Sequence, residues 1–235
     1  MRLRKAVSLA IDRDDLIASN AGGAAVSGFI PAAFTEFSWP EEKLRERFKR
    51  DVEQARKLVA DAGYKPGDAS AGLSTGLKFV MKTATLYQQD AEVVQQALAA
   101  IGIETSVLPE GDTFNAVLQK GDFEIASGIA GGAGNLVNYF AFNFIRTGSS
   151  NNYLAISDPE IDRLATAQAR EMDPAKRKQL IGQLQHREFE VMPYVPTVSR
   201  YYYYTSSCRA KNLRTTRLNM NPEVDKHVWI DETGC

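Results

Sequence analysis

Residues 4–17 of the chain read RKAVSLAIDRDDLI. Leu3, Val7, Ala10 and Ile11 fall at helical spacing along this stretch, so that one stripe of it is mostly apolar. The pattern predicts a single amphipathic helix with a basic start. Its apolar stripe is expected to pack against other elements of the fold.

Strand and helix patterns alternate in the middle of the chain. Short apolar-rich strands are expected at 77–82, 104–108 and 123–127, and helices at 87–100 and around 114–118. This order of strand, helix, strand, helix and strand is typical of α/β units, in which at least part of the sheet is parallel. The residues therefore predict an α/β fold with right-handed crossovers.

Further helices are expected on both sides of this region. Residues 52–62 keep the 3.6-residue period and stop at Gly63, as a glycine after a helix end should. The stretch SDPE at 157–160 predicts a helix start with a Ser-x-x-Glu capping box. The pair DP at 173–174 predicts a second helix, which ends before Pro193.

The remaining stretches carry weaker patterns. Residues 20–40 are rich in Gly, Ala, Ser and Pro and are expected to form a loop, whereas 41–50 reads as a solvated helix face or turn. Residues 136–145 have a helical pattern, and 195–205 are rich in β-formers. If the four tyrosines at 201–204 form a strand, two rings point inward and two point outward.

Composition excludes some classes of function. The 235 residues are 44% hydrophobic, and a net charge of −1 argues against a nucleic-acid-binding protein, which usually has a basic excess. No apolar run reaches the roughly 18 residues of a membrane span. The first residues do not form an export leader, although a longer chain could carry one.

Few side chains suggest metal or redox chemistry. Cys208 and Cys235 can pair in an oxidising compartment, but the pattern favours two incidental thiols. His186 and His227 have no companions at metal-ligand spacing, so no metal site is expected, and His186 is expected at the surface. No cofactor is expected.

The stretch GLSTG at 72–76 fits the G-x-S-x-G pattern of serine hydrolases. A nucleophile elbow follows a strand and precedes a helix, but here a loop precedes Ser74 and a strand follows it. A plain linker is therefore the favoured interpretation. A hydrolase that uses Ser74 with His186 or His227 is kept as an alternative.

Two polar or glycine-rich stretches are candidates for binding a small ligand. The glycines at 128–134 follow a strand and precede a helical pattern, so the backbone there can approach a ligand at the carboxyl end of a sheet strand. The stretch SSNNY at 149–153 offers many donors and acceptors, although a turn before the next helix explains it slightly better. The candidate ligand-binding residues are Gly131, Gly132, Ala133, Gly134, Asn135, Asn138, Ser150, Asn151, Asn152 and Tyr153.

Six stretches, in this order, resemble the family 5 extracellular solute-binding proteins, the receptors of bacterial ABC importers. They are RKAVSLAIDRDDLI, DVEQARKLVADAGYKPG, QALAAIGIETSV, GDFEIASG, NNYLAISDPEIDRLATAQ and RKQLIGQLQHREFEVMPYVP. The resemblance implies one lobe of a two-lobed periplasmic-binding-protein fold (type II-like), with a mixed sheet flanked by helices. Residues 1–192 would form the C-terminal ligand-binding lobe, and 193–235 would return to a missing N-terminal lobe.

The resemblance also implies a function without catalysis. The receptor would capture peptides or a related small solute in a cleft between two lobes and deliver it to a membrane permease. Peptide-binding members often carry an Asp near the position of Ala133, but no acid occurs between Ser127 and Ile145. A nickel chelate, an opine or a sugar therefore remains an alternative ligand. The implied location is periplasmic, or extracellular and lipid-anchored.

Overall fold

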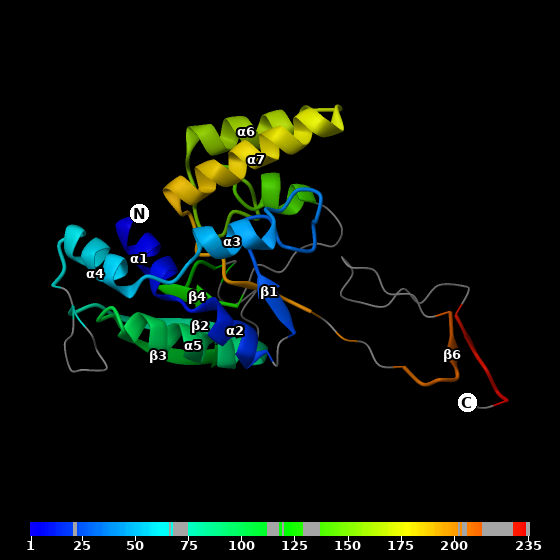
Figure 1. The fold of residues 1–235 in the computed structure, drawn as a ribbon, viewed down its shortest axis with the longest axis horizontal. Coiled ribbons are helices and arrows are strands. Elements are labelled where there is room, and N and C mark those ends of the chain that lie inside the picture. Colours follow the sequence, from blue (N-terminus) through cyan, green and yellow to red (C-terminus); the bar gives the residue numbers. More distant parts are fainter. Residues whose placement is uncertain are drawn as a thin grey trace.

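The computed structural model describes most of the chain. The described residues are 1–20, 23–65, 67, 75–111, 118, 120–128, 137–201, 203, 206–212 and 228–233. Figure 1 shows a body of helices around a small sheet, a helical hairpin above it, and a short pair of strands set apart on the C-terminal side.

A three-stranded parallel sheet forms the centre of the body. Its strands are β2 (Lys78–Ala84), β3 (Glu104–Glu110) and β4 (Ile125–Ser127), in the order β3-β2-β4. Met81 lies opposite Val107 on one side and Ile125 on the other. The predicted parallel α/β arrangement is confirmed, with strand boundaries shifted by a few residues.

Helix α5 (Gln88–Ala99) connects β2 to β3 after a short turn, η2 (Thr85–Tyr87). Its buried residues Ala91, Val94 and Leu98 share a core with Met81 of the sheet. Gly102, with φ +80°, turns the chain into β3, and a side chain there would meet Gly67 at 2.7 Å. The glycine between helix and strand is therefore required by both conformation and space.

The helix expected at 4–17 is two helices, so that prediction is wrong. Helix α1 (Arg2–Ala10) ends at Ile11, whose backbone is extended, and α2 (Arg13–Ser19) begins anew. The Asp12 side chain accepts hydrogen bonds from the backbone N–H groups of Asp14 and Asp15 and so caps α2. The apolar period continues across the break, which is why periodicity alone missed it.

Helix α4 (Val52–Asp61) packs on α1. Its buried residues Ala55 and Val59 meet Ala6 and Ala10 in the same core as α5 and the sheet. Gly63 follows the helix with φ +93°, as the sequence predicted.

A second body is formed by α6 (Pro159–Arg170) and α7 (Pro174–Val191), which lie side by side in Figure 1. Both starts were predicted, but Asp158, not Ser157, caps α6, because its carboxylate accepts from Glu160 N and Ile161 N. Arg187 of α7 also binds that carboxylate at 2.7 Å. The hairpin is therefore tied at the start of α6.

The helical pattern at 136–145 forms a π-helix over Tyr139–Asn143 (η4). Aromatic rings of η4 and of the adjoining Phe144 pack with rings from the loop before residue 41 and from the segment after α7. Phe34 contacts Phe140, and Tyr194 contacts Phe144. These contacts join η4 to the α6–α7 hairpin in one apolar cluster.

Two segments far apart in the sequence pair between the two bodies. β1 (Ala24–Val26) runs antiparallel to β5 (Val198–Arg200), and α3 (Glu41–Arg47) lies beside β1. The loop expected at 20–40 therefore contains a strand that sequence periodicity missed. We name the surrounding apolar cluster the joint; it consists of Val26, Phe29, Trp39, Leu44, Phe48 and Met192, with Ile17, Phe189, Tyr194 and Val195 packed against it.

Arg13 is buried in this joint, at 5% exposure. Its guanidinium donates to the carbonyl oxygens of Ser8, Phe48 and Pro196 at 3.1, 2.9 and 2.8 Å. It also lies 4.7 Å from the centre of the Phe48 ring. Burial lowers the pKa of Arg13 to about 10, so that the side chain stays charged at neutral pH.

Glu188 of α7 is buried as well, at 1% exposure. Among the described residues, neither of its carboxylate oxygens has a hydrogen-bond partner. Burial raises the pKa of Glu188 well above its usual range. The pKa of Tyr194 is raised too, by burial first and then by the nearby Glu188. Burial therefore favours the neutral form of the Glu188 carboxyl group.

The C-terminal part carries the short strands β6 (Ala210–Lys211) and β7 (Trp229–Ile230), which pair antiparallel. Cys208 is disulfide-bonded, so the interpretation as an incidental thiol is wrong. Tyr201 and Tyr203 are both exposed, while Tyr202 and Tyr204 lie outside the described residues. The lobe boundary at residue 192 stays a prediction.

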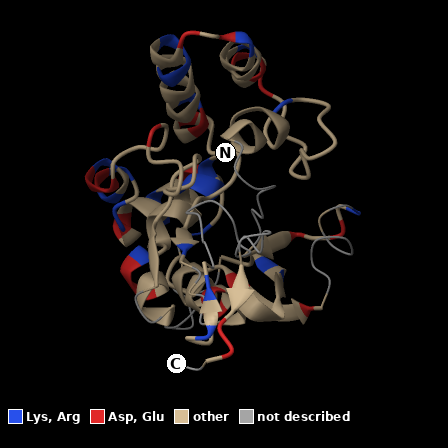
Figure 2. Cartoon of the chain, turned by 90° about the vertical axis from the view of Figure 1, so that its right-hand side faces the viewer, with Lys and Arg blue, Asp and Glu red and all other residues tan. Residues whose placement is uncertain are grey.

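Charges of both signs are interspersed along the helices in Figure 2, in keeping with the net charge of −1. Within the described ranges, no helix combines the length and apolar character that crossing a membrane requires.

Candidate functional site

The carboxyl ends of β2 and β4 form the candidate site. The chain leaves β2 toward β3 on one side, whereas β4 lies on the other side of β2. The connections therefore diverge at the ends of β2 and β4, and open α/β sheets bind ligands outside such a point. The sheet topology thus selects one edge of the body.

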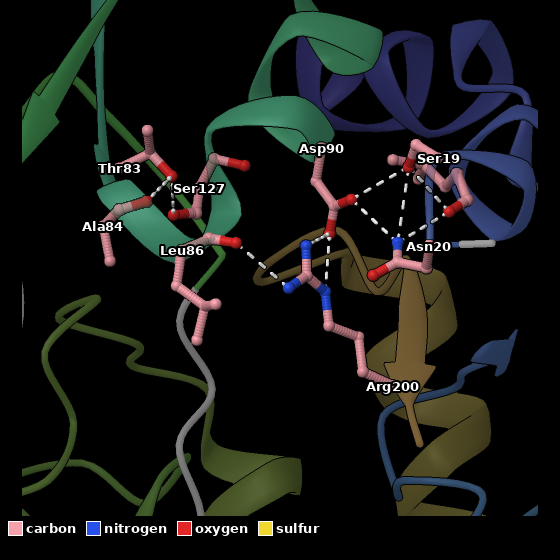
Figure 3. Close-up of polar contacts among 9 residues, drawn as sticks. Ser19, Asn20, Thr83, Ala84, Leu86, Asp90, Ser127 and Arg200 are labelled. Atoms are coloured by element: carbon pink, nitrogen blue, oxygen red, sulfur yellow. Dashed lines mark hydrogen bonds and ion pairs between the residues drawn. The ribbon is translucent and has the colours of Figure 1, made fainter. Parts of the chain in front are cut away.

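Hydrogen bonds fix the geometry of this edge (Figure 3). Thr83, fully buried near the end of β2, donates from Oγ1 to the carbonyl oxygen of Ser127 in β4 at 3.0 Å. The two strand ends are thereby joined beyond their backbone pairing. A ligand at this edge would meet a preformed frame.

Gly128 follows β4 and opens the glycine-rich stretch. Its φ is +86°, and a side chain there would lie 2.5 Å from Cβ of Tyr87. Only glycine fits this position, because the left-handed backbone and the Tyr87 contact both exclude a Cβ. The predicted site residues Gly131, Gly132, Ala133, Gly134 and Asn135 lie outside the described residues.

An ion pair stands beside the edge in Figure 3. Arg200 of β5 contacts the Asp90 carboxylate at 2.9 Å and donates to the carbonyl oxygen of Leu86 at 3.1 Å. Asp90 also accepts from Ser19 Oγ at 3.0 Å and from Asn20 Nδ2 at 2.9 Å. The charges of Arg200 and Asp90 therefore neutralise each other. We interpret this ion pair as a structural support beside the candidate site.

Arg200 links this ion pair to the glycine-rich stretch. Its guanidinium lies 4.5 Å from the centre of the Tyr87 ring, and Tyr87 in turn is the residue against which Gly128 packs. A cation over a tyrosine ring is attracted by the electron-rich face. The strand β5 is thus coupled through Tyr87 to the start of the stretch that follows β4.

Asn138, a predicted site residue, lies at the start of the π-helix. Its Oδ1 accepts from Gln168 Nε2 and from Arg177 Nη2, both at 3.0 Å. Gln168 is completely buried, and Arg177 is half-buried. The structure therefore joins Asn138 to the far end of the α6–α7 hairpin.

The predicted site residues at 151–153 form hydrogen bonds within the turn before α6. Asn152 donates to the carbonyl oxygens of Ile156 and Arg146 and accepts from Ile156 N, and Tyr153 donates its hydroxyl to Asn151. Ser150 is exposed. Much of the polar capacity at 150–153 is thus used within the turn before α6, and a ligand-binding role there stays a prediction.

Several residues of the site escaped the sequence reasoning, namely Thr83, Tyr87, Asp90, Gln168, Arg177 and Arg200. One usable signal was present: Arg200 is a lone charge within a run of β-formers, which suggests a buried or paired cation. The amide and tyrosine side chains gave no such signal, because their partners come from distant segments.

Among the described residues, no other candidate chemistry is assembled. Ser74 and His227 lie outside the described residues, and His186 is exposed beside Trp39, with ring centres 5.0 Å apart. In the described part of the chain, no group of His, Cys, Asp or Glu side chains is placed to hold a metal ion. Surface hollows of about 400 and 290 Å³, along α3 and beside Arg13, include no residue of the sheet edge.

The chain resembles known proteins in sequence. Residues 1–153 match the family model of the bacterial extracellular solute-binding proteins, family 5 middle. The oligopeptide-binding protein AppA of Bacillus subtilis (strain 168) is 28% identical over 109 residues, which are 44% of this chain and 20% of AppA. The chain thus spans about a fifth of the length of this curated relative.

Solved structures share the fold. AppA from Bacillus subtilis in complex with a nonapeptide is 18% identical, with a TM-score of 0.70 over 92% of this chain and 45% of that structure. An oligopeptide-binding protein from Thermotoga maritima with bound mannohexaose is 19% identical, with a TM-score of 0.75 over 91% of this chain and 44% of that structure. AgaA from A. tumefaciens R10, in complex with agropinic acid, is 24% identical, with a TM-score of 0.69 over 85% of this chain and 40% of that structure.

These likenesses confirm the expected fold of a periplasmic binding protein, of which the chain covers less than half in each of these structures. The family model extends over more than half of the chain, from α1 through β4 and η4. The chain therefore belongs to the bacterial extracellular solute-binding proteins of family 5.

Proposed function

We propose that the chain is part of the substrate-binding component of a bacterial ABC importer and binds a small solute at the carboxyl ends of β2 and β4. The observation that carries the proposal is the packing of Gly128 on Tyr87 at the divergence point of the sheet. The glycine-rich stretch starts there, and its backbone N–H groups can approach a solute closely.

Peptides are the proposed ligand class, with an opine, a sugar or a nickel chelate as alternatives. The curated relative is named an oligopeptide-binding protein, whereas similar structures hold a nonapeptide, mannohexaose or agropinic acid. Between Ser127 and Ile145 the chain has no acid to hold a peptide ammonium. A ligand contacted through backbone and amide groups fits this stretch.

The proposed mechanism is closure of two lobes around the solute. Residues 1–192 would form one lobe, and 193–235 would return to the second lobe of the receptor. A solute that contacts both lobes favours the closed state by its differential affinity, and that state would be presented to the permease. The pairing of β5 with β1 supports a connection at this boundary.

The proposed location is periplasmic, or extracellular and lipid-anchored. The disulfide at Cys208 supports it, because disulfides persist mainly in oxidising compartments outside the cytoplasm. The family is a solute-binding one without enzymatic activity. We therefore expect no labelling of Ser74 by a fluorophosphonate probe, and labelling would revive the hydrolase alternative.

The test is titration of a receptor that contains this chain together with its second lobe, with a synthetic nonapeptide, mannohexaose and agropinic acid, by calorimetry and native mass spectrometry. Binding of at least one probe is expected, and Gly128→Ala is expected to weaken it at least tenfold. Gly148→Ala is the matched control, because Gly148 also has a positive φ but nothing within 4 Å of an added Cβ. Failure of all three probes to bind would overturn the proposal.

A further inference from the structure

A surface hollow of about 290 Å³ borders the joint, because Val26 and Phe48 of the joint belong to its lining. The rest of the lining is charged, and cations outnumber acids in it. The charged residues are Asp12, Asp14, Arg13, Arg45, Lys49 and Arg50. The lining of this hollow therefore carries an excess of positive charge at neutral pH.

Arg45 has little of this positive charge to offer a ligand. Its Nη1 contacts the Asp14 carboxylate at 2.7 Å, and its Nε contacts the carboxylate of Glu41, which lies outside the lining, at 2.9 Å. The Asp14 side chain is 74% exposed, so water and salt screen its charge. Even with Glu41 counted, the cations around the hollow outnumber the acids.

Lys49 and Arg50 keep donors that the fold does not use. Within the described part of the chain, no acid forms an ion pair with Lys49 Nζ. Arg50 donates from Nε to the carbonyl oxygen of Ala10 at 3.2 Å, but its Nη1 is 3.9 Å from Asp12, beyond hydrogen-bond distance. Both side chains are exposed. They can therefore reach a ligand in the hollow.

Arg13 contributes a buried charge to the same lining, at 5% exposure. Its hydrogen bonds go to carbonyl oxygens and to the Ser8 hydroxyl, and none goes to a carboxylate. Its Nε has no hydrogen-bond partner among the described residues. Because water screens a buried charge less than an exposed one, Arg13 attracts an anion in the hollow more strongly than a surface arginine would.

We propose that this hollow binds a small oxyanion of the phosphate or sulfate type, at a site separate from the candidate solute site. Lys49 and Arg50 donate charge-assisted hydrogen bonds to its oxygens, and Arg13 attracts it through its charge. The volume far exceeds the roughly 30 Å³ of one liquid water, so an oxyanion fits with part of its hydration. The bound anion connects the segment after α3 to the start of α2 and so stabilises the joint.

Calorimetric titration at constant ionic strength tests the site. The protein is the receptor that contains this chain with its second lobe, and sodium phosphate or sodium sulfate replaces sodium chloride. One saturable site per chain is expected for at least one of the two oxyanions, with a Kd of about 1 mM or below. The same anion is expected to raise the Tm, because it binds the folded state.

Lys49→Gln is the first variant, and it is expected to weaken binding at least about fivefold, because it removes a cation that has no acid of its own. Lys57→Gln is the charge-matched control, since Lys57 is an exposed lysine of α4 outside the lining. Its affinity is expected to stay within about twofold of the unchanged receptor. Equal weakening by the two changes would show general attraction by net charge and would overturn the site.

Asp14→Asn changes the charge of the lining in the opposite direction. It removes one acid and releases Arg45 from one of its two carboxylates, so the affinity is expected to rise about threefold. A rise in Asp14→Asn together with a fall in Lys49→Gln supports the proposal. A fall in both variants would show that the anion does not respond to the charge of the hollow, and it would overturn the proposal.

Two further outcomes would overturn the inference. One is the absence of a saturable site for both phosphate and sulfate, which leaves the proposed function intact, because the hollow includes no residue of the sheet edge. The other is Lys49-dependent binding to phosphatidylglycerol vesicles without binding of free phosphate. That result would assign the hollow to a lipid headgroup instead of a free oxyanion.

Discussion

Arg13 and Glu188 are both buried, but their surroundings treat them in opposite ways. Arg13 keeps its charge because three carbonyl oxygens, from Ser8, Phe48 and Pro196, surround its guanidinium. Glu188 has no hydrogen-bond partner within the described structure, and burial raises its pKa, which favours the neutral form. The surroundings of Arg13 thus supply hydrogen-bond acceptors to a buried cation, whereas the surroundings of Glu188 disfavour its ionised form.

The difference shows what each residue contributes. The carbonyl oxygens around Arg13 come from three separate segments, so the charge acts as a tie among them. Glu188 links no segments through hydrogen bonds in the described structure, so its side chain contributes to the fold mainly by packing. We therefore expect Arg13 to stabilise the fold at all ordinary pH values and Glu188 to make stability depend on pH.

The largest effect is expected from Arg13→Leu. It leaves the three buried carbonyl oxygens without a donor, which should lower the free energy of unfolding by about 4 kcal/mol. Urea unfolding followed by circular dichroism measures this loss. Arg170→Leu is the control, since Arg170 is exposed at the end of α6, and should change stability by no more than about 0.5 kcal/mol. Equal effects of the two changes would contradict the role of Arg13.

The next effect concerns pH. An unfolded glutamate ionises near pH 4.3, but folded Glu188 stays protonated well above that, so its contribution is full below about pH 4.3 and declines as pH rises toward the raised pKa. One proton corresponds to about 1.4 kcal/mol per pH unit. Glu188→Gln should therefore reduce the loss of stability that accompanies a rise in pH above about 4.3.

Unfolding curves at several pH values measure the slope for Glu188→Gln. Glu36→Gln serves as the control for the loss of an exposed carboxylate and should leave the slope as it is in the unchanged chain. An unaltered slope in Glu188→Gln would mean that Glu188 is ionised in the folded chain.

Asp90 represents an intermediate case, a buried acid that is paired with a cation. Asp90→Asn leaves Arg200 without a counter-ion and should cost about 2 kcal/mol of folding stability. Combination with Arg200→Gln should cost less than the sum of the two single changes, because both remove the same contact. Strict additivity of the two changes would show that the ion pair contributes nothing.

The smallest effect is expected on the surface. Arg45 contacts Asp14 at 2.7 Å and Glu41 at 2.9 Å, yet it is largely exposed. Water and salt screen such pairs, so Arg45→Gln should cost about 0.5 kcal/mol or less, and less still at high salt. If Arg45→Gln lowered the free energy of unfolding more than Asp90→Asn does, the stability cost would not follow the burial of the ion pair.

Much of the fold could be predicted because its signals are local. The starts of α6 and α7, the end of α4 at Gly63 and the alternation around β2 all follow from caps, glycines and periodicity within a few residues. The break at Asp12 could not be found in this way, because an apolar stripe that runs on across a cap looks like one helix.

The contacts of the candidate site depend on distant segments, which local patterns do not report. β1 has no strong β-pattern and pairs only because β5 comes back to it. The partners of Asn138 lie in α6 and α7, and Gly128 needs its φ because of Tyr87. The sequence could therefore indicate the glycine-rich edge, but not which side chains hold it.

The tie at Arg13 has a consequence for the order in which the chain folds during synthesis. Its partner Pro196 is 183 positions away, and the strand partner of residues 24–26 is 198–200. At about 5–20 residues per second, a ribosome needs roughly 10 to 35 s to add the intervening residues. During that interval the first strand has an open edge and the guanidinium remains in water. The joint therefore cannot be completed until residues 196–200 have been made, and a nascent chain stalled before residue 196 would expose it to chaperones.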